Sequence, residues 1–105
     1  MSETQAVNAN VYRVRLIGVL ATAAGKREVE IQTPSQLTVS DLITTLLDQV
    51  QNRQFKDFLV DSATNDPRPN VIILLNEQDC NIFQGLQTRL DEGTVITIIP
   101  VAHGG

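Results

Sequence analysis

The 105-residue sequence is poor in the side chains from which catalytic and metal sites are built. It has one cysteine, Cys80, one histidine, His103, and no tryptophan. A single cysteine excludes an internal disulfide framework and cysteine-rich zinc or iron–sulfur sites, and it suits a reducing compartment. Cys80 could act as a nucleophile only with a histidine at the end of the chain, so a structural thiol is the simpler interpretation. We expect no catalytic residue, metal or bound cofactor in this chain.

Basic charge is also scarce, with eight Lys and Arg against twelve Asp and Glu. The basic residues are scattered, so direct binding to nucleic acid is not expected. The most apolar stretch, residues 16–25, is shorter than the roughly 20 residues that cross a bilayer. Residues 1–10 are polar and carry Glu3 where a secretory signal has basic charge. These features predict a cytoplasmic protein with no membrane partner and a flexible N-terminal arm over residues 1–10.

Alternating hydrophobicity predicts two strands early in the chain. Apolar and charged side chains alternate over residues 11–18, which is typical of a half-buried strand. A second strand follows, in which Val29 and Ile31 share one face. We expect the two strands to pair as a hairpin whose loop covers residues 21–26.

A helix is predicted in the middle of the sequence. Thr38 followed by Asp41 resembles a capping box, and apolar side chains then recur at helical spacing over residues 39–50. We take this stripe as core rather than as a groove for a partner. A shorter helical pattern spans residues 55–59, and the two prolines in residues 61–70 predict an irregular segment there.

The last third of the sequence predicts further strands. An uninterrupted apolar run over residues 71–75 indicates a strand that is covered on both faces or lies at the centre of a sheet, and we place it at the centre. We expect a polar turn at residues 76–79, a short strand at 80–83 and a helical or irregular turn at 86–91. The final strand covers residues 94–101.

These elements predict an α+β fold of β-grasp type over residues 11–101, with a mixed four- to five-stranded sheet and one main helix packed across it. The alternation leaves Thr97 and Ile99 on the open face. The side chains expected under the helix are Tyr12, Val14, Leu16, Val29, Ile31, Ile96 and Ile98.

The end of the chain carries the clearest functional signal. The final strand leads into residues 102–105, a flexible tail that closes on Gly104 and Gly105. Glycines bury nothing and lose the most entropy on ordering, so a terminal pair adds no stability. A thread without Cβ atoms can instead enter a narrow channel and present the Gly105 carboxylate to a partner's active site. An ATP-consuming partner can convert that carboxylate into an acyl-adenylate, which sulfide, thiol or amine then attacks. A chance flexible end is the alternative.

The sequence LDEGTVITIIPVAHGG, residues 90–105, resembles the C-terminus of the ubiquitin-like sulfur carriers. Pro100-Val101-Ala102 is similar to the small subunit of molybdopterin synthase, although that subunit has a second proline and no histidine before the glycines. His103-Gly104-Gly105 is similar to the ending of the ubiquitin-related modifier, as residues 68–79 are to its central strand and turn. The mixed tail resembles the small archaeal modifiers, which serve both roles, and the subfamily stays open.

The resemblance implies that a ubiquitin-activating-type enzyme, using ATP and Mg²⁺, adenylates Gly105 for conversion to a thiocarboxylate. The sulfur then goes through a sulfurtransferase or thiouridylase to tRNA held by another protein, or to molybdopterin, or Gly105 is joined to target-protein lysines. One alternative is the small subunit of molybdopterin synthase, whose tail enters the large subunit. Another is a non-covalent β-grasp interaction module.

Several residues near the tail are candidates for recognition. Ile99 and Val101 are expected outside the helix-covered face, where they either dock the activating enzyme or pack under a loop. Pro100 has no N–H to donate, so we expect it to end the strand ladder and free the tail, or to be an edge proline with a role in the fold alone. His103 and Gly104 are candidates for tail recognition, with a solvated His103 as the alternative.

Overall fold

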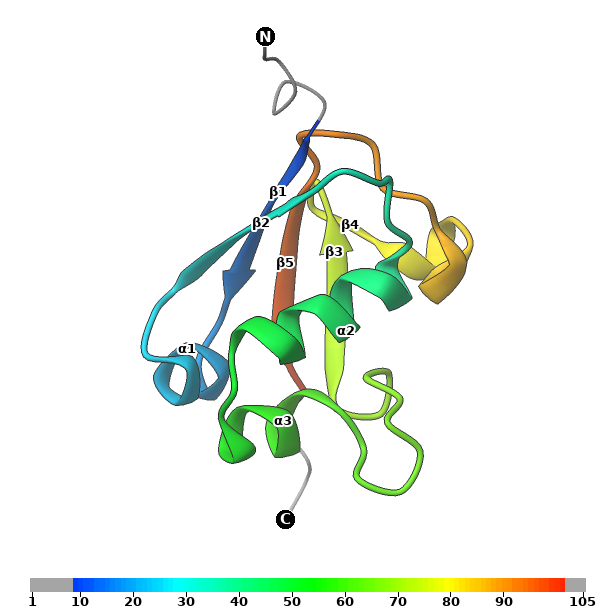
Figure 1. Ribbon diagram of the computed structural model, residues 1–105. Helices are drawn as coiled ribbons and strands as arrows, with labels where there is room; N and C mark the ends of the chain where they lie inside the picture. Colours follow the sequence, from blue (N-terminus) through cyan, green and yellow to red (C-terminus); the bar gives the residue numbers. More distant parts are fainter. Residues whose placement is uncertain (1–8, 102–105) are drawn as a thin grey trace, which may run out of the picture.

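The computed structural model describes residues 9–101, which fold around a mixed five-stranded sheet with strand order β2-β1-β5-β3-β4 (Figure 1). The strands are β1 (Asn10–Leu16), β2 (Glu28–Thr33), β3 (Val71–Leu75), β4 (Gln78–Asp79) and β5 (Val95–Pro100). The β1–β5 pair is parallel and the other pairs are antiparallel. The expected tail over residues 102–105 lies outside the described residues, as does the expected arm apart from its last two residues, and Asn10 already belongs to β1.

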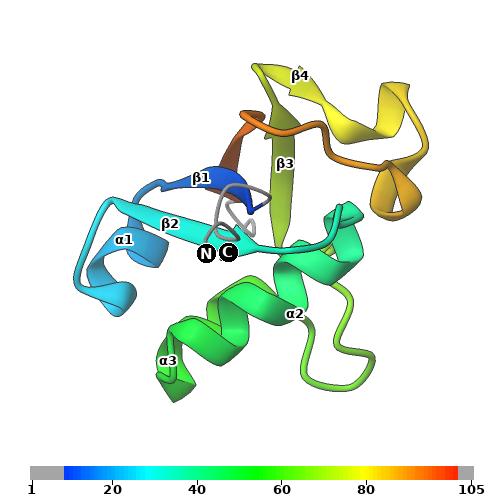
Figure 2. The same ribbon diagram turned by 45° about the horizontal axis from the view of Figure 1, so that its top comes forward.

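The main helix lies across one face of the sheet, and α3 lies on the same side of the sheet (Figure 2). The helices are α1 (Val19–Ala24), α2 (Val39–Gln49) and α3 (Arg53–Leu59), with short 3₁₀ turns η2 (Cys80–Ile82) and η3 (Gly85–Gln87). This arrangement confirms the predicted α+β fold of β-grasp type.

The capping box predicted for α2 is present. Thr38 Oγ1 accepts a hydrogen bond from the Asp41 amide at 3.1 Å, and Asp41 Oδ2 accepts one from the Thr38 amide at 3.2 Å. The apolar stripe of α2 packs on the sheet, so its assignment to the core is confirmed. The sheet side chains expected under the helix are all buried as well. The predicted inward and outward faces of β1, β2 and β5 are therefore confirmed.

The loop expected at residues 21–26 is wrong in part, because helix α1 occupies most of it. The sequence there is rich in alanine, which has the highest helix propensity, but six residues are too few for a readable helical period. Leu20 is the only residue of α1 that is fully buried. The antiparallel pairing of β1 with β2 is confirmed.

The central position predicted for residues 71–75 is also wrong. The middle strand of the sheet is β5, and β3 is the second strand from the edge. The run is not covered on both faces, since Ile72 is 42% exposed on the open face opposite Ile99. An apolar run does not require every side chain to be buried, and in β3 the side chain of Ile72 is exposed.

The connection after β3 differs from the prediction in two places. Residues 78–79, expected in a turn, form the edge strand β4, and residues 80–83, expected as a strand, begin with the 3₁₀ turn η2. The Asp79 carboxylate accepts a hydrogen bond from the Asn81 amide at 2.9 Å, which favours a turn over an extended chain. The irregular segment over residues 61–70 is confirmed.

A buried tyrosine hydroxyl joins three segments of the fold. Tyr12 of β1 donates from its hydroxyl to the Leu90 carbonyl at 2.9 Å and accepts from the Leu37 amide at 3.4 Å. Leu37 precedes α2 and Leu90 precedes β5, so one side chain links the segment that leads into the main helix to the segment that leads into β5.

Replacing Tyr12 by phenylalanine is expected to lower the free energy of unfolding by about 1 kcal/mol, measured by chemical denaturation. The loss stays small because Gln36 Nε2 still donates to the Leu90 carbonyl at 3.2 Å. The control is Tyr12→Leu, which also removes ring volume and should cost more. An unchanged free energy of unfolding in Tyr12→Phe, beside a clear loss in Tyr12→Leu, would show that the hydroxyl contributes little.

Candidate functional site

The chain approaches its C-terminal residues through the middle of the sheet. Strand β5 pairs with β1 as far as Leu16↔Ile98 and with β3 as far as Val71↔Pro100. The last described residue is Val101, four residues before Gly105. We call the segment formed by Pro100 and Val101 the tail root. It therefore begins at a strand held on both sides.

The tail root is fixed to α3 through Asn70. The Val101 amide donates to the Asn70 carbonyl at 2.9 Å. The Asn70 side-chain amide donates in turn to the Asp57 carbonyl at 3.2 Å. Asn70 ends the irregular segment after α3, in which the Asp61 carboxylate accepts from the Ala63 and Thr64 amides. The turn-rich sequence thus builds the support of the tail root.

The last pair of the β3–β5 ladder is at Pro100, but the chain is still held one residue further, because the Val101 amide bonds to the Asn70 carbonyl. Neighbouring residues of a strand direct their N–H groups to opposite sides. The nitrogen of Pro100 therefore faces the β1 side, where β1 has ended and the Ile17 amide donates to the Ile98 carbonyl at 3.2 Å. Because β1 does not pair with Pro100, the missing N–H of proline removes no hydrogen bond from the sheet at this position.

Gly18 covers Pro100 from the β1 side. Its backbone adopts φ 60° and ψ −130°, a combination that favours glycine. A Cβ atom at Gly18 would lie 3.5 Å from Pro100 Cγ. The turn from β1 into α1 thus packs directly against the tail root.

The structure places the two candidate docking residues in different surroundings. Ile99 is half-buried on the open face of the sheet, opposite the exposed Ile72. Val101 is 36% exposed and lines a shallow cleft of about 220 Å³. The other lining residues of this tail-root cleft are Val19, Asp57, Phe58, Asn70 and Pro100.

Sequence reasoning missed Val19 and Phe58 as surface residues. Phe58 belonged to an apolar helical pattern and Val19 to the most apolar stretch, so both looked like core. Phe55 and Leu59 of α3 are indeed fully buried, but Phe58 is 36% exposed. The remaining candidates, His103, Gly104 and Gly105, lie outside the described residues.

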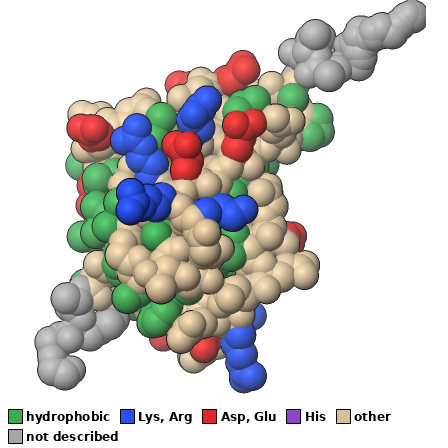
Figure 3. Space-filling view, turned by 90° about the vertical axis from the view of Figure 1, so that its left-hand side faces the viewer, with side chains coloured by type: hydrophobic (Ala, Val, Ile, Leu, Met, Phe, Trp, Pro, Cys, Tyr) green, Lys and Arg blue, Asp and Glu red, His purple; other side chains and the backbone are tan. Residues whose placement is uncertain are grey.

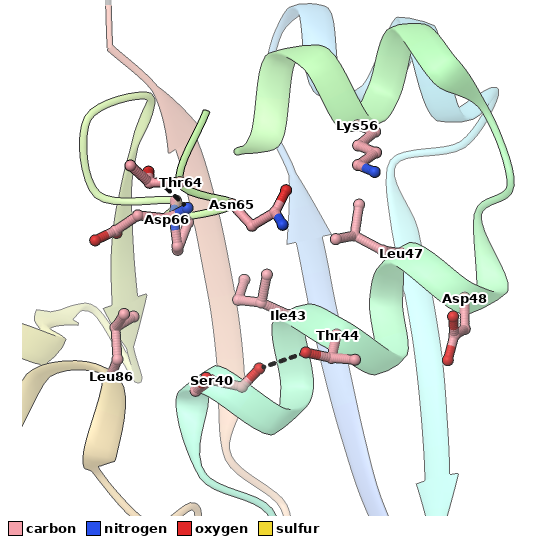
Figure 4. A pocket seen from close by; sticks show the side chains of 11 residues that line it. Ser40, Ile43, Thr44, Leu47, Asp48, Lys56, Thr64, Asn65, Asp66 and Leu86 are labelled. Atoms are coloured by element: carbon pink, nitrogen blue, oxygen red, sulfur yellow. Dashed lines mark hydrogen bonds between the residues drawn. The ribbon is translucent and has the colours of Figure 1, made fainter. Parts of the chain in front are cut away.

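A larger cleft of about 540 Å³ lies between α2, α3 and the segment 61–70 (Figure 4). Ile43 and Leu47 form its apolar floor, and Lys56 and Asn65 reach into it from opposite sides. Lys56 faces this cleft, whereas the next two residues of α3 line the tail-root cleft. Helix α3 therefore separates the two hollows.

Opposite charges alternate across β1 and β2. The register pairs Arg13 with Glu30 and Arg15 with Glu28, and Arg13 Nη1 lies 3.9 Å from Glu28 Oε1. Figure 3 shows the molecule from this side, with basic and acidic side chains next to one another. This surface therefore has a mixed charge.

Cys80 is buried, with 2% of its surface exposed. Burial, and to a smaller extent the charge of Asp79, raises the pKa of its thiol. Across residues 9–101, no three His, Cys, Asp or Glu side chains form a group that could hold a metal ion. In the same part of the chain, no helix has the length and apolar character needed to cross a bilayer.

The mixed sheet, the helix across it and the central position of β5 form a ubiquitin-like fold. The family model and the curated relatives place the chain in the sulfur-carrier and modifier superfamily. The model of the ThiS family matches residues 14–105, and the chain belongs to that family.

Two curated relatives are similar to the chain over most of its length, and a solved structure shares its fold. The "Ubiquitin-related modifier 1 homolog" of Dictyostelium discoideum is 26% identical over 96 residues, which are 89% of this chain and 97% of that protein. The "Ubiquitin-related modifier 1" of Candida glabrata is 30% identical over 95 residues, or 89% and 96% of the two chains. The solution structure of small archaeal modifier protein 1 from Methanosarcina acetivorans has a TM-score of 0.76 at 24% identity, covering 92% of this chain and 98% of that one.

Replacing Gly18 by alanine is expected to lower the free energy of unfolding by about 2 kcal/mol, because its backbone angles strain any residue with a Cβ. It should also speed hydrogen exchange of the Val101 amide, since the turn packs on the tail root. The control is Gly25→Ala at φ 77° and ψ 14°, where nothing lies within 4 Å of the added Cβ. That change should cost about 1 kcal/mol and leave Val101 unaffected. Equal effects at both glycines would contradict the role given to Gly18.

The Cys80 thiol is expected to react slowly with an aromatic disulfide reagent at pH 8. Its raised pKa lowers the thiolate fraction below that of the unfolded chain, and burial blocks access to the sulfur. We expect a rate at least about ten-fold lower than in denaturant, measured by release of the coloured thiol. Because the pKa is raised, the rate should still be rising with pH at the ordinary value of 9.0, where an unperturbed thiol begins to level off. Labelling as fast as in denaturant would show that the thiol is accessible.

Proposed function

We propose that this protein is a carrier whose Gly105 carboxylate is activated by a ubiquitin-activating-type enzyme. Membership of the ThiS family and similarity to ubiquitin-related modifiers support the proposal. The observation that carries it is the anchored tail root. The Val101 amide is hydrogen-bonded to the carbonyl of Asn70, the residue before β3, and four further residues span at most about 14 Å when extended. A carboxylate on such a thread can be presented to an active site inside another protein.

The chemistry belongs to the partner, which supplies ATP and Mg²⁺. An oxygen of the Gly105 carboxylate attacks the α-phosphorus of ATP, pyrophosphate leaves, and an acyl-adenylate forms. A sulfur nucleophile held by a sulfurtransferase then attacks the carbonyl carbon, and AMP leaves. When that nucleophile is the outer sulfur of a persulfide, the product is an acyl disulfide. A second thiol of the sulfurtransferase then attacks the donor sulfur, so that a disulfide forms on the donor and a thiocarboxylate is left at Gly105. Attack by the amine of a target-protein lysine gives an isopeptide bond instead.

Each of the residues at and near the tail has its own part in recognition by the activating enzyme. Gly104 keeps the thread narrow, His103 contributes a hydrogen bond to tail recognition, and Pro100 sets the direction in which the chain leaves the sheet. Ile99 and Val101 contribute apolar contacts to the activating enzyme. The names of the relatives favour a modifier, so target-protein lysines are one proposed acceptor of Gly105. For the sulfur, the proposed acceptors are tRNA held by a thiouridylase or molybdopterin.

The test incubates the protein with its activating enzyme, ATP, Mg²⁺ and a sulfur source, followed by intact mass measurement. We expect the mass change for exchange of one oxygen for sulfur. The matched control lacks Gly104 and Gly105 but keeps residues 9–101, and it should show no exchange. Absence of both sulfur exchange and lysine adducts in the full chain would contradict the proposal.

Co-purification distinguishes the remaining possibilities. Stable capture of a molybdopterin synthase large subunit would identify molybdopterin as the sulfur acceptor. A partner and a phenotype that both survive removal of the two glycines would indicate a non-covalent interaction module.

A further inference from the structure

Three exposed apolar side chains from separate elements meet at the tail-root cleft. Val19 comes from the first turn of α1, Phe58 from α3, and Val101 from the end of β5. Their exposed fractions are 45%, 36% and 36%. Helix α1 packs against α3, so both walls of the cleft rest on a buried support. The cleft is therefore a formed apolar surface at the point where the chain leaves the fold.

Neither helix needs these side chains for its own packing. On α1 the core contact comes from Leu20, which is fully buried next to Val19. On α3 the core contacts come from Phe55 and Leu59, which are also fully buried. An aromatic and a β-branched side chain placed together in solvent forgo the stabilisation that burial would give. Clustered exposed apolar residues with a polar rim mark an interaction surface.

The position of the cleft beside the tail root favours the enzyme that acts on Gly105 as its occupant. An enzyme that acts on the Gly105 carboxylate works within about 14 Å of Val101, because only four residues separate the two. The mouth of a channel that holds the tail must therefore approach the tail root itself. The cleft lies directly beside that root.

The size and chemistry of the cleft favour a protein side chain as its occupant. Its volume of about 220 Å³ is below the roughly 300–1,000 Å³ of small-molecule sites. Most of its lining residues are apolar, and the exposed, acidic Asp57 also lines it. The Asn70 amide is already committed to the Asp57 carbonyl. An apolar side chain with a basic group beside it matches this lining.

We infer that the tail-root cleft docks an apolar side chain at the mouth of the enzyme channel that receives the tail, with a basic group of that enzyme facing Asp57. The inference rests on the proposed activation of Gly105 and names a contact surface beyond Ile99 and Val101. It brings α1 and α3 into recognition, so the partner contacts the helical side of the tail root as well as the sheet.

The test measures adenylation kinetics with the full chain, the activating enzyme and saturating ATP. The double variant Val19→Ser/Phe58→Ser should raise KM for the carrier about ten-fold or more, equivalent to about 1.4 kcal/mol. Its kcat should change little, because the tail is intact. The matched control, Ile82→Ser/Phe83→Ser, removes two equally apolar side chains that are 63% and 48% exposed on the η2 segment. Its KM should stay within about two-fold of the wild type.

A second pair of variants covers the case in which the serine variant is unfolded. Asp57→Lys reverses the charge at the cleft rim and should raise KM several-fold at low salt and less at high salt. Asp48→Lys makes the same change in net charge on α2, at the larger cleft, and should leave KM unchanged. Equal KM values across each pair would overturn the inference.

Other occupants give different results. If residues 102–105 of the same chain cover the cleft, deleting them will shift the NMR signals of Val19 and Phe58 in the isolated protein, and docking is overturned. If a second copy covers it, sedimentation will show a dimer that Val19→Ser/Phe58→Ser dissociates, which also overturns it. Failure of the wild type to be adenylated contradicts the proposed function itself, whereas normal adenylation with an unchanged KM in the cleft variants contradicts only this inference.

Discussion

The structure depends on the pairing of β5 along both of its edges. The last strand of the described chain is its central strand, bonded to β1 in parallel and to β3 in antiparallel register. Ile96 and Ile98 bury their side chains completely under α2 from this position. The tail root, Pro100 and Val101, thus follows directly on the contacts that form the core. Folding the domain and fixing the start of the tail are one event.

Support for the tail root comes from regions distant in sequence. The turn at Gly18 packs against Pro100, and the irregular segment after α3 ends at Asn70, which holds the Val101 amide. The first of these regions belongs to the β1–α1 connection and the second to the α3–β3 connection. Both are loops in the usual sense, yet each has a backbone group or side chain in contact with the last described residues. The connections of this fold therefore position its candidate functional end.

Sequence patterns with a clear helical or strand period correctly predicted the elements that they span, whereas short stretches without a period gave wrong predictions. The apolar side chains at helical spacing over residues 39–50 and the cap at Thr38 correctly predicted α2. Alternating hydrophobicity correctly predicted the buried and open faces of β1, β2 and β5. The six-residue α1 was missed because alanines carry no period. The central position predicted for β3 was wrong, because an apolar sequence shows that a strand is largely buried but does not determine its place in the order of strands. The tail root could be placed from sequence, but the approach of Val19 and Phe58 to Val101 depends on tertiary packing.

The geometry of β5 also determines how the tail responds to a pull. A partner that draws the tail into a channel exerts force along the axis of the central strand. The hydrogen bonds on both edges run across the strand, so this force loads them in shear and all at once, rather than opening them one by one from an edge. The domain is therefore mechanically strong in the one direction in which its candidate function would load it.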